Sequence, residues 1–199
     1  MNDCISCIPI TVGCNQPINS IAFDGCFYFS TTQNCCQIVR FSPCDQNAHT
    51  YCTTREYSSL CYDWLEHCFW ATSRCNFNII YKLDCNMCEI DSIKVCGVSV
   101  GGPINDITYN CCNNTLIVCY NNLVVEVSKH CADAKCLYRS QLSWIMGVTA
   151  LSPGIILTVM RHNQCYIEIY DMCFCLINSY QVDRNKRIKN LMFNPCHTV

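Results

Sequence analysis

Charge and glycine are scarce in this sequence. Charged residues make up 14% of the 199 residues, and 13 basic against 15 acidic side chains leave a formal net charge of −2. No run of lysine or arginine could follow a phosphate backbone, so we expect no nucleic-acid partner. With only seven glycines, the chain shows no glycine-rich phosphate loop. Asparagine is expected to replace glycine in many turns, because it tolerates left-handed backbone conformations.

Long apolar runs are missing as well. No window approaches the ~18 consecutive apolar residues that a membrane helix needs, so no membrane association is expected. The first residues, MNDCISCIPI, lack the basic start and the continuous apolar block of a secretory signal peptide. These absences favour a soluble protein that is synthesised in the cytoplasm.

Apolar residues and cysteine are abundant instead. Apolar side chains form 51% of the chain, which is enough to bury a core and argues against disorder. In a short secreted protein, 23 cysteines would predict a disulfide framework, whereas an intracellular chain normally keeps its thiols reduced. An odd number cannot pair completely within one molecule. Reduced thiols, metal thiolates and cross-linking after synthesis therefore all remain open.

A short pattern recurs five times along the chain: an apolar residue, two of any kind, an apolar residue, any residue, an apolar residue and then often Asp or Asn. The copies are 18–24 (INSIAFD), 57–63 (YSSLCYD), 104–110 (INDITYN), 145–151 (IMGVTAL) and 188–194 (IKNLMFN). Each of the first four continues into a nearly all-apolar segment and then into one of strict alternation, such as YKLD at 81–84. Strict alternation is typical of a strand with one solvent-facing side.

A fourth strand is more weakly marked, at 90–95, 137–142 and 176–182. Four short antiparallel strands in each unit of about 40 to 45 residues are typical of a β-propeller blade. We therefore predict an all-β propeller or propeller fragment, a single propeller-like domain over residues 1–199. Its four antiparallel four-stranded blades are predicted at 18–56, 57–103, 104–144 and 145–187, and extra terminal strands at 8–12 and 188–195. An open arc of blades would expose apolar faces, so we expect self-association.

These repeats resemble the blades of NHL, YVTN and lactonase-like propeller proteins. The resemblance rests on the apolar start that ends in Tyr-Asp or Phe-Asp, on FWATS at 69–73 and on IIYKLD at 79–84. It covers 18–195 as a repeat pattern and implies the propeller fold, but its motifs are structural and do not specify a function. A lactonase-like enzyme would imply carboxylates and asparagines that hold a calcium ion over the central channel. Asp106 has no acidic counterpart in the other repeats.

Ligands of propellers usually meet the loops around the central channel. Arg74, Arg161 and His162 fall in loops that join the second strand of a blade to the third. Asp106 and its neighbour Asn105 are candidates where the third blade begins. The predicted binding residues are Arg74, Asp106, Arg161 and His162. The sequence shows no acid–base pair, no Ser-His-Asp order and no shared metal spacing among its histidines, so we predict no catalytic residue and no cofactor.

Every predicted blade carries a cysteine pair after its third strand, in the turn toward the outermost strand. The pairs are Cys44 and Cys52, Cys85 and Cys88, Cys131 and Cys136, and Cys173 and Cys175. Only Cys85 and Cys88 have the spacing of a zinc knuckle, and a second knuckle to complete four ligands is missing. No helix follows that would lower a thiol pKa, as in a redox pair. We expect turn disulfides or cross-links between molecules at this rim.

The sequence thus favours a non-enzymatic interaction or structural scaffold, with a protein partner or self-association. Rim thiols that cross-link in an oxidising shell, such as a spore coat, would reconcile abundant cysteine with the missing signal peptide. Two alternatives remain open. One is a lactonase-like or lyase-like propeller enzyme with a metal in its channel, and the other is a thiolate metal-binding protein.

Overall fold

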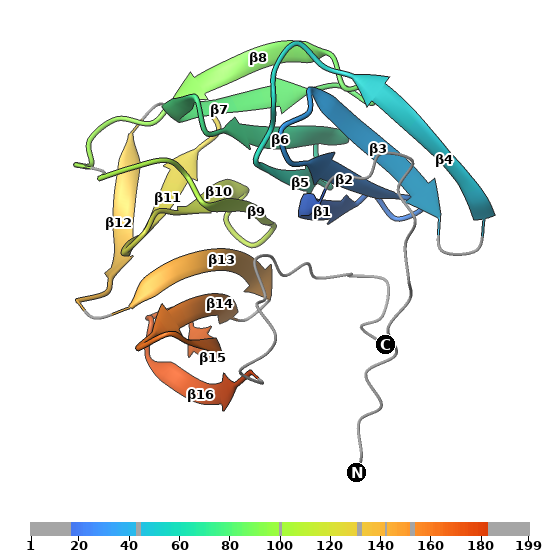
Figure 1. The fold of residues 1–199 in the computed structure, drawn as a ribbon. Coiled ribbons are helices and arrows are strands. Elements are labelled where there is room, and N and C mark those ends of the chain that lie inside the picture. Colours follow the sequence, from blue (N-terminus) through green and yellow to red (C-terminus); the bar gives the residue numbers. More distant parts are fainter. Residues whose placement is uncertain are drawn as a thin grey trace.

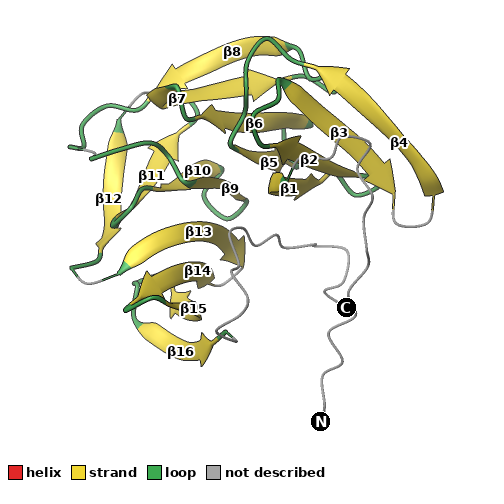
Figure 2. Cartoon of the chain, viewed as in Figure 1, coloured by secondary structure: helices red, strands yellow, loops and turns green. Residues whose placement is uncertain are grey.

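The computed structural model describes residues 17–42, 45–99, 101–130, 133–141, 143–151 and 154–182. This part of the chain forms sixteen β-strands in four separate antiparallel sheets of four strands each (Figure 1 and Figure 2). It contains no helix, and so none that could cross a membrane. The predicted all-β class and the four four-stranded blades are confirmed.

Each sheet is one blade, and its strands follow one another in sequence order. The first and second blades consist of β1 (Ile18–Phe23), β2 (Tyr28–Thr32), β3 (Gln37–Ser42), β4 (Asp45–Cys52), β5 (Ser59–Asp63), β6 (Cys68–Ser73), β7 (Asn76–Leu83) and β8 (Glu89–Lys94). The third and fourth consist of β9 (Asp106–Asn110), β10 (Thr115–Cys119), β11 (Leu123–Ser128), β12 (Ala134–Arg139), β13 (Trp144–Leu151), β14 (Gly154–Arg161), β15 (Gln164–Asp171) and β16 (Leu176–Gln181). Short turns suffice, because antiparallel neighbours place consecutive strand ends together.

The blades stand side by side along an arc (Figure 1). Their first strands, β1, β5, β9 and β13, are innermost and contact one another in that order. Within the described residues, β13 and β1 share no contact of similar extent. The described strands therefore follow an arc from the first blade to the fourth, and not a closed ring.

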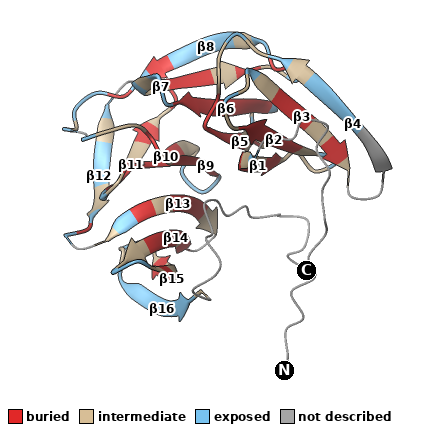
Figure 3. Ribbon diagram, in the orientation of Figure 1, coloured by how far each residue is buried: buried red, intermediate tan, exposed pale blue. Residues whose placement is uncertain are grey.

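Burial decreases from the centre of the arc outward (Figure 3). Every residue of β6, whose sequence is CFWATS, is buried, whereas every residue of β16 is exposed. A strand that lies between two neighbouring blades is covered on both faces, so it is apolar throughout. This gradient explains why the second segment of each repeat is almost continuously apolar in sequence.

Hydrophobic clusters fill the three interfaces between consecutive blades. Between the first and second blades, Phe29 packs on Phe69 with ring centroids 4.6 Å apart. Trp70 belongs to the cluster between the second and third blades, and Leu157 to that between the third and fourth. Burying one such side chain contributes about 1.5–3 kcal/mol, so the blades depend on one another for stability.

Polar side chains also connect consecutive inner strands. The third residue of one repeat accepts a hydrogen bond from the backbone N–H of the fourth residue in the next. These bonds run from Leu60 N to Ser20 Oγ (3.1 Å), from Ile107 N to Ser59 Oγ (3.2 Å) and from Val148 N to Asp106 Oδ2 (3.0 Å). A buried N–H without a partner costs about 1–3 kcal/mol, so these bonds favour one register between neighbouring blades.

Asparagines occupy several tight turns, as the scarcity of glycine predicts. Asn34, Asn114 and Asn163 adopt positive φ angles of 58°, 54° and 61°. Each lies in a turn between consecutive strands of a blade. Left-handed backbone is least costly for glycine and next for asparagine, whose short polar side chain bonds locally.

The outer strands depart most from the prediction. β8 and β16 lie within one residue of the predicted ranges, but β12 begins three residues before the predicted 137–142. A register shift between Val124 and Val125 of β11 displaces the pairing of β12. Exposed and less exposed residues do not alternate strictly along β12. β13 begins at Trp144, one residue before the predicted boundary of the fourth blade. The strands predicted at 8–12 and 188–195 lie outside the described residues.

Candidate functional site

A pocket of about 210 Å³ opens where the starts of the four innermost strands meet. All four blades line it. The second residue of every repeat contributes, and the lining consists of Asn19, Ser58, Arg74, Ile104, Asn105, Trp144, Met146 and Met160. Because equivalent positions of all four blades converge there, the pocket lies at the mouth of the central channel.

Arg74 is the charged residue of this pocket. It lies in the turn between β6 and β7, and its side chain is exposed. Among the described residues it forms none of the ion pairs, and no acidic side chain lines the pocket. Among the described residues, the pocket therefore carries a local positive charge that no lining carboxylate neutralises.

Asn19 is a second polar residue of the pocket, and its amide can form further hydrogen bonds. It is 8% exposed, and among the described residues neither its Oδ1 nor its Nδ2 atom has a hydrogen-bond partner. By contrast, Asn105 Nδ2 donates to Asn121 Oδ1 at 3.1 Å and to the backbone oxygen of Ile145 at 2.8 Å. Ser58 Oγ donates to the backbone oxygen of Thr72 at 3.2 Å. Asn19 alone of these three leaves a donor and an acceptor free at the pocket.

The other predicted channel residues lie elsewhere. Arg161, at the end of β14, forms an ion pair with Glu168 of β15 and stacks over the Tyr166 ring. His162 follows in the exposed turn with a φ of 47°, and neither residue lines the pocket. Asp106 is a buried residue of β9 rather than of a channel loop, and its carboxylate accepts the blade-to-blade hydrogen bond. Only Arg74 of the four reaches the pocket.

The C-x-x-C sequence of Cys85 and Cys88 lies in the turn between β7 and β8. Asp84 Oδ1 organises this turn by accepting from the backbone N–H groups of Asn86 at 2.9 Å and Cys88 at 2.8 Å. Met87 adopts a left-handed φ of 62° and its side chain is buried between the first two blades. Both thiols are exposed.

The turn between β15 and β16 repeats this geometry. Asp171 Oδ1 accepts from Cys173 N at 2.9 Å and from Cys175 N at 2.8 Å, and Phe174 takes the left-handed position with a φ of 58°. The common sequence is Asp, two residues of any kind, an apolar residue and Cys. The second cysteine of each pair is therefore equivalent, although the spacing within the two pairs differs.

The remaining predicted rim cysteines do not share this position. Cys52 is the last residue of β4, and Cys136 lies within β12, so placing these two in the turn was wrong. β4 covers most of the sequence between Cys44 and Cys52. The sequence of this outer strand has little apolar pattern, so strand and turn could not be distinguished there. Cys44 and Cys131 lie outside the described residues. Cys52 and Cys136 are exposed like the turn thiols.

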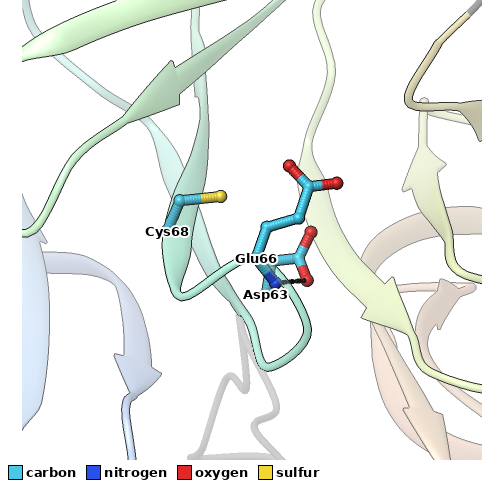
Figure 4. A group of neighbouring side chains, drawn as sticks. All are labelled: Asp63, Glu66 and Cys68. Atoms are coloured by element: carbon cyan, nitrogen blue, oxygen red, sulfur yellow. Dashed lines mark hydrogen bonds between the residues drawn. The ribbon is translucent and has the colours of Figure 1, made fainter.

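Three potential metal ligands come together at the side of the second blade: Asp63, Glu66 and Cys68 (Figure 4). A lysine from the third blade fills this cluster. Lys129 Nζ lies 2.7 Å from Asp63 Oδ2 and 2.6 Å from Glu66 Oε1, and its side chain is almost fully buried. Trp70 Nε1 donates to Asp63 Oδ2 at 3.1 Å. The ammonium group therefore stands where a cation would bind.

The protonation states fit an ion pair better than a metal centre. Hydrogen bonds from Lys129 and then Lys82 lower the pKa of Glu66, so this carboxylate stays ionised. Burial raises the pKa of the Cys68 thiol to about 11, so this thiol is protonated at neutral pH. A thiolate, and not a thiol, is the strong metal ligand. The cluster thus serves as an electrostatic contact between the second and third blades.

Comparison with known proteins relates the fold to solved propellers. No protein-family model matches the sequence, and no curated protein does. The structure is similar to that of the nidogen/laminin complex, with a TM-score of 0.69 at 14% identity, covering 88% of this chain and 67% of the other. It is also similar to the WD40 propeller domain of Doa1, with a TM-score of 0.55 at 11% identity, covering 84% and 69%.

A third similar structure is hydrazine synthase of Kuenenia stuttgartiensis, with a TM-score of 0.59 at 11% identity. The match covers 85% of this chain but only 50% of the enzyme chain, so this protein spans about half its length. At such identities the likeness concerns the fold alone, and the two named propellers are parts of a binding complex and a WD40 domain. The chain thus has a β-propeller fold with four described blades.

Proposed function

We propose that this protein is a non-enzymatic interaction or structural scaffold whose copies are cross-linked through exposed cysteines. The observation that carries the proposal is the distribution of the thiols. Twelve cysteines are exposed among the seventeen in the described residues, at 26, 36, 52, 75, 85, 88, 96, 111, 112, 136, 173 and 175. A propeller core needs none of these side chains for packing, so another role must explain their number.

Two further observations support a scaffold. Asp106, the carboxylate that a channel-bound calcium would use, is engaged between β9 and β13. The cluster around Asp63 is filled by the Lys129 ammonium. The proposal needs no cofactor.

The chemistry is disulfide formation between two molecules. Two thiols lose two protons and two electrons to an oxidant such as oxidised glutathione, which is reduced to its thiol form. Exposed turn thiols suit this step, because a sulfur must be reached by a second molecule and must ionise to attack. An oxidising shell built from protein made inside the cell, such as a spore coat, is the setting that we propose.

The experiment is oxidation of the purified chain with oxidised glutathione, followed by a non-reducing gel. We expect a ladder of oligomers that a reducing agent collapses to monomer. A variant with serine at Cys85, Cys88, Cys173 and Cys175, which lie in the outer turns, should give a clearly weaker ladder than the wild type, although other exposed thiols remain.

The matched control replaces the same number of exposed cysteines in turns between inner strands: Cys26, Cys75, Cys111 and Cys112. This variant should keep the ladder. A wild-type protein that runs only as monomer after oxidation would contradict the proposal, and equal losses in both variants would contradict the role of the outer turns.

A further inference from the structure

The channel pocket combines a positive charge with a lining that, within the described part of the chain, contains no acidic residue. Arg74 contributes a guanidinium, whose planar set of N–H donors matches a carboxylate in two parallel hydrogen bonds. Sites for phosphate usually gather several cations or a nest of backbone N–H groups. A single arginine in a pocket with one free amide therefore suits a monoanion better than a phosphate.

Asn19 supplies an independent observation. Its amide is more than nine-tenths buried and borders the same pocket, and neither polar atom has a partner in the part of the chain that the structure describes. Leaving such a group unsatisfied costs about 1–3 kcal/mol, which a ligand that accepts from Nδ2 would recover. Buried polar groups are usually hydrogen-bonded, so an exception at a pocket points to an occupant.

The rest of the pocket is apolar and small. Trp144, Met146 and Met160 of the fourth blade and Ile104 of the third provide the apolar part of the lining. Methionine and tryptophan offer adaptable and large apolar contact surfaces. A volume of about 210 Å³ lies below the roughly 300–1,000 Å³ of sites for drug-sized ligands. The occupant is therefore a small molecule or the end group of a larger one.

We propose that this pocket binds a carboxylate with a short apolar chain, through the Arg74 guanidinium and the Asn19 amide. The carboxylate accepts from Arg74 and from Asn19 Nδ2, and the chain contacts the methionine wall. A free organic acid and the C-terminal residue of a peptide both carry this chemistry. The site is independent of the cysteines on which the proposed cross-linking rests.

Isothermal titration calorimetry with the full chain in reducing buffer tests the proposal. Sodium hexanoate is the free-acid probe, and hexanamide is its neutral counterpart. We expect hexanoate to bind with a dissociation constant on the order of 1 mM, as suits a ligand of this size. Hexanamide should bind at least about tenfold more weakly, because it lacks the charge-assisted bonds. A second pair, acetyl-Gly-Leu with a free or an amidated C-terminus, tests the peptide source.

Variants locate the binding. Arg74→Met should weaken carboxylate binding at least about tenfold, and Asn19→Ala should weaken it several-fold. Arg139→Met is the matched control, because Arg139 is exposed on the outer strand β12, away from the pocket. It should bind like the wild type, and unchanged circular dichroism should show that the variants are folded.

Binding of either carboxylate that depends on Arg74 supports the site, and the stronger of the two probes identifies the source. Equal binding of the acid and its amide would overturn the proposal. So would full retention of binding by folded Arg74→Met, or a lack of binding by both carboxylates at concentrations of tens of millimolar.

Discussion

Lys129 joins the second and third blades through a buried ion pair with Asp63. Although burial opposes its charge, hydrogen bonds to Asp63 and Glu66 raise the pKa of Lys129 above its ordinary value. Its ammonium and the Asp63 carboxylate are both buried, so each compensates the charge of the other. Removing one partner of a buried pair is more costly than replacing both, because the remaining charge stays desolvated.

We predict that Lys129→Met lowers the free energy of unfolding by about 3–5 kcal/mol. The double variant Lys129→Met/Asp63→Asn should recover part of this loss, since no buried charge is then left without a counterion. Urea unfolding followed by circular dichroism measures both effects. A double variant that is less stable than Lys129→Met would show that the charge pair is not the cause.

Glu89 makes stability depend on pH. Hydrogen bonds from Arg55, then from Thr54 and Tyr57, outweigh burial and lower the pKa of Glu89 from 4.5 to about 2. Because the carboxylate is ionised more easily in the folded protein than in the unfolded chain, its stabilisation is complete above about pH 4.5. It is lost as the pH falls from 4.5 toward 2.

We therefore predict that Glu89→Gln is less stable than the wild type at pH 7, and that the difference shrinks as the pH falls below 4.5. The two proteins should approach equal stability near pH 2. Urea midpoints at pH 7, 4.5, 3 and 2 provide the measurement. A constant difference at all four values would mean that Glu89 acts without its charge.

Part of the candidate site could be predicted from the sequence. Arg74 was predicted because a charged residue in a loop from the second to the third strand suggests a channel ligand. Asn19 was missed, since asparagine is common in turns and a single one carries no signal. Aligning the repeats places Asn19, Ser58, Asn105 and Met146 at the same position, which was the signal available. Which of them lacks a partner depends on contacts between blades and required the structure.

In the second and fourth blades, the turn between the third and fourth strands holds neighbouring blades together at their outer edges. Met87 is buried between the first two blades, and Phe174 stacks on Tyr138 of the third blade with ring centroids 5.5 Å apart and planes at 8°. In both turns, the residue with left-handed backbone, Met87 or Phe174, directs its apolar side chain toward the preceding blade. These turns therefore have a packing role that their cysteines do not share.

We predict that Met87→Ala destabilises the protein by about 2–5 kcal/mol, because it removes a buried side chain and leaves a cavity between blades. Met172→Ala is the matched control in the equivalent turn of the fourth blade, where the methionine is 40% exposed. It should change stability by less than about 0.5 kcal/mol. Chemical denaturation measures both variants, and equal losses would argue against the packing role.

Strands could be predicted from the sequence where burial produces a regular pattern of apolar residues. Inner strands such as β6 and β10 have continuous apolar sequences, because neighbouring blades cover both faces. The outer strand β12 and residues 48–52 of β4 are largely exposed, so polar and apolar residues alternate irregularly there. The misplacement of Cys52 and Cys136 follows from this loss of pattern. A repeat length alone could not indicate where a turn ends and an exposed strand begins.

At the scale of the whole molecule, the fourth blade presents an unusual outer strand. All six residues of β16 are exposed, and three are large and apolar: Leu176 at 53%, Ile177 at 64% and Tyr180 at 53%. β16 pairs only with β15 in its sheet, so its other edge carries backbone groups without a strand partner there. An exposed apolar edge is a template for pairing with a strand of another molecule.

We predict that the protein also self-associates through β16 without any disulfide, and therefore in its reduced state. Sedimentation velocity in reducing buffer should show an average mass that rises with protein concentration. Ile177→Lys should suppress the rise, because a charge at an edge disfavours edge-to-edge pairing. Ile90→Lys is the matched control, since Ile90 is 57% exposed on β8, the outer strand of the second blade, where no second large apolar side chain is exposed. Association that persists in Ile177→Lys, or that both variants lose equally, would move the contact away from β16.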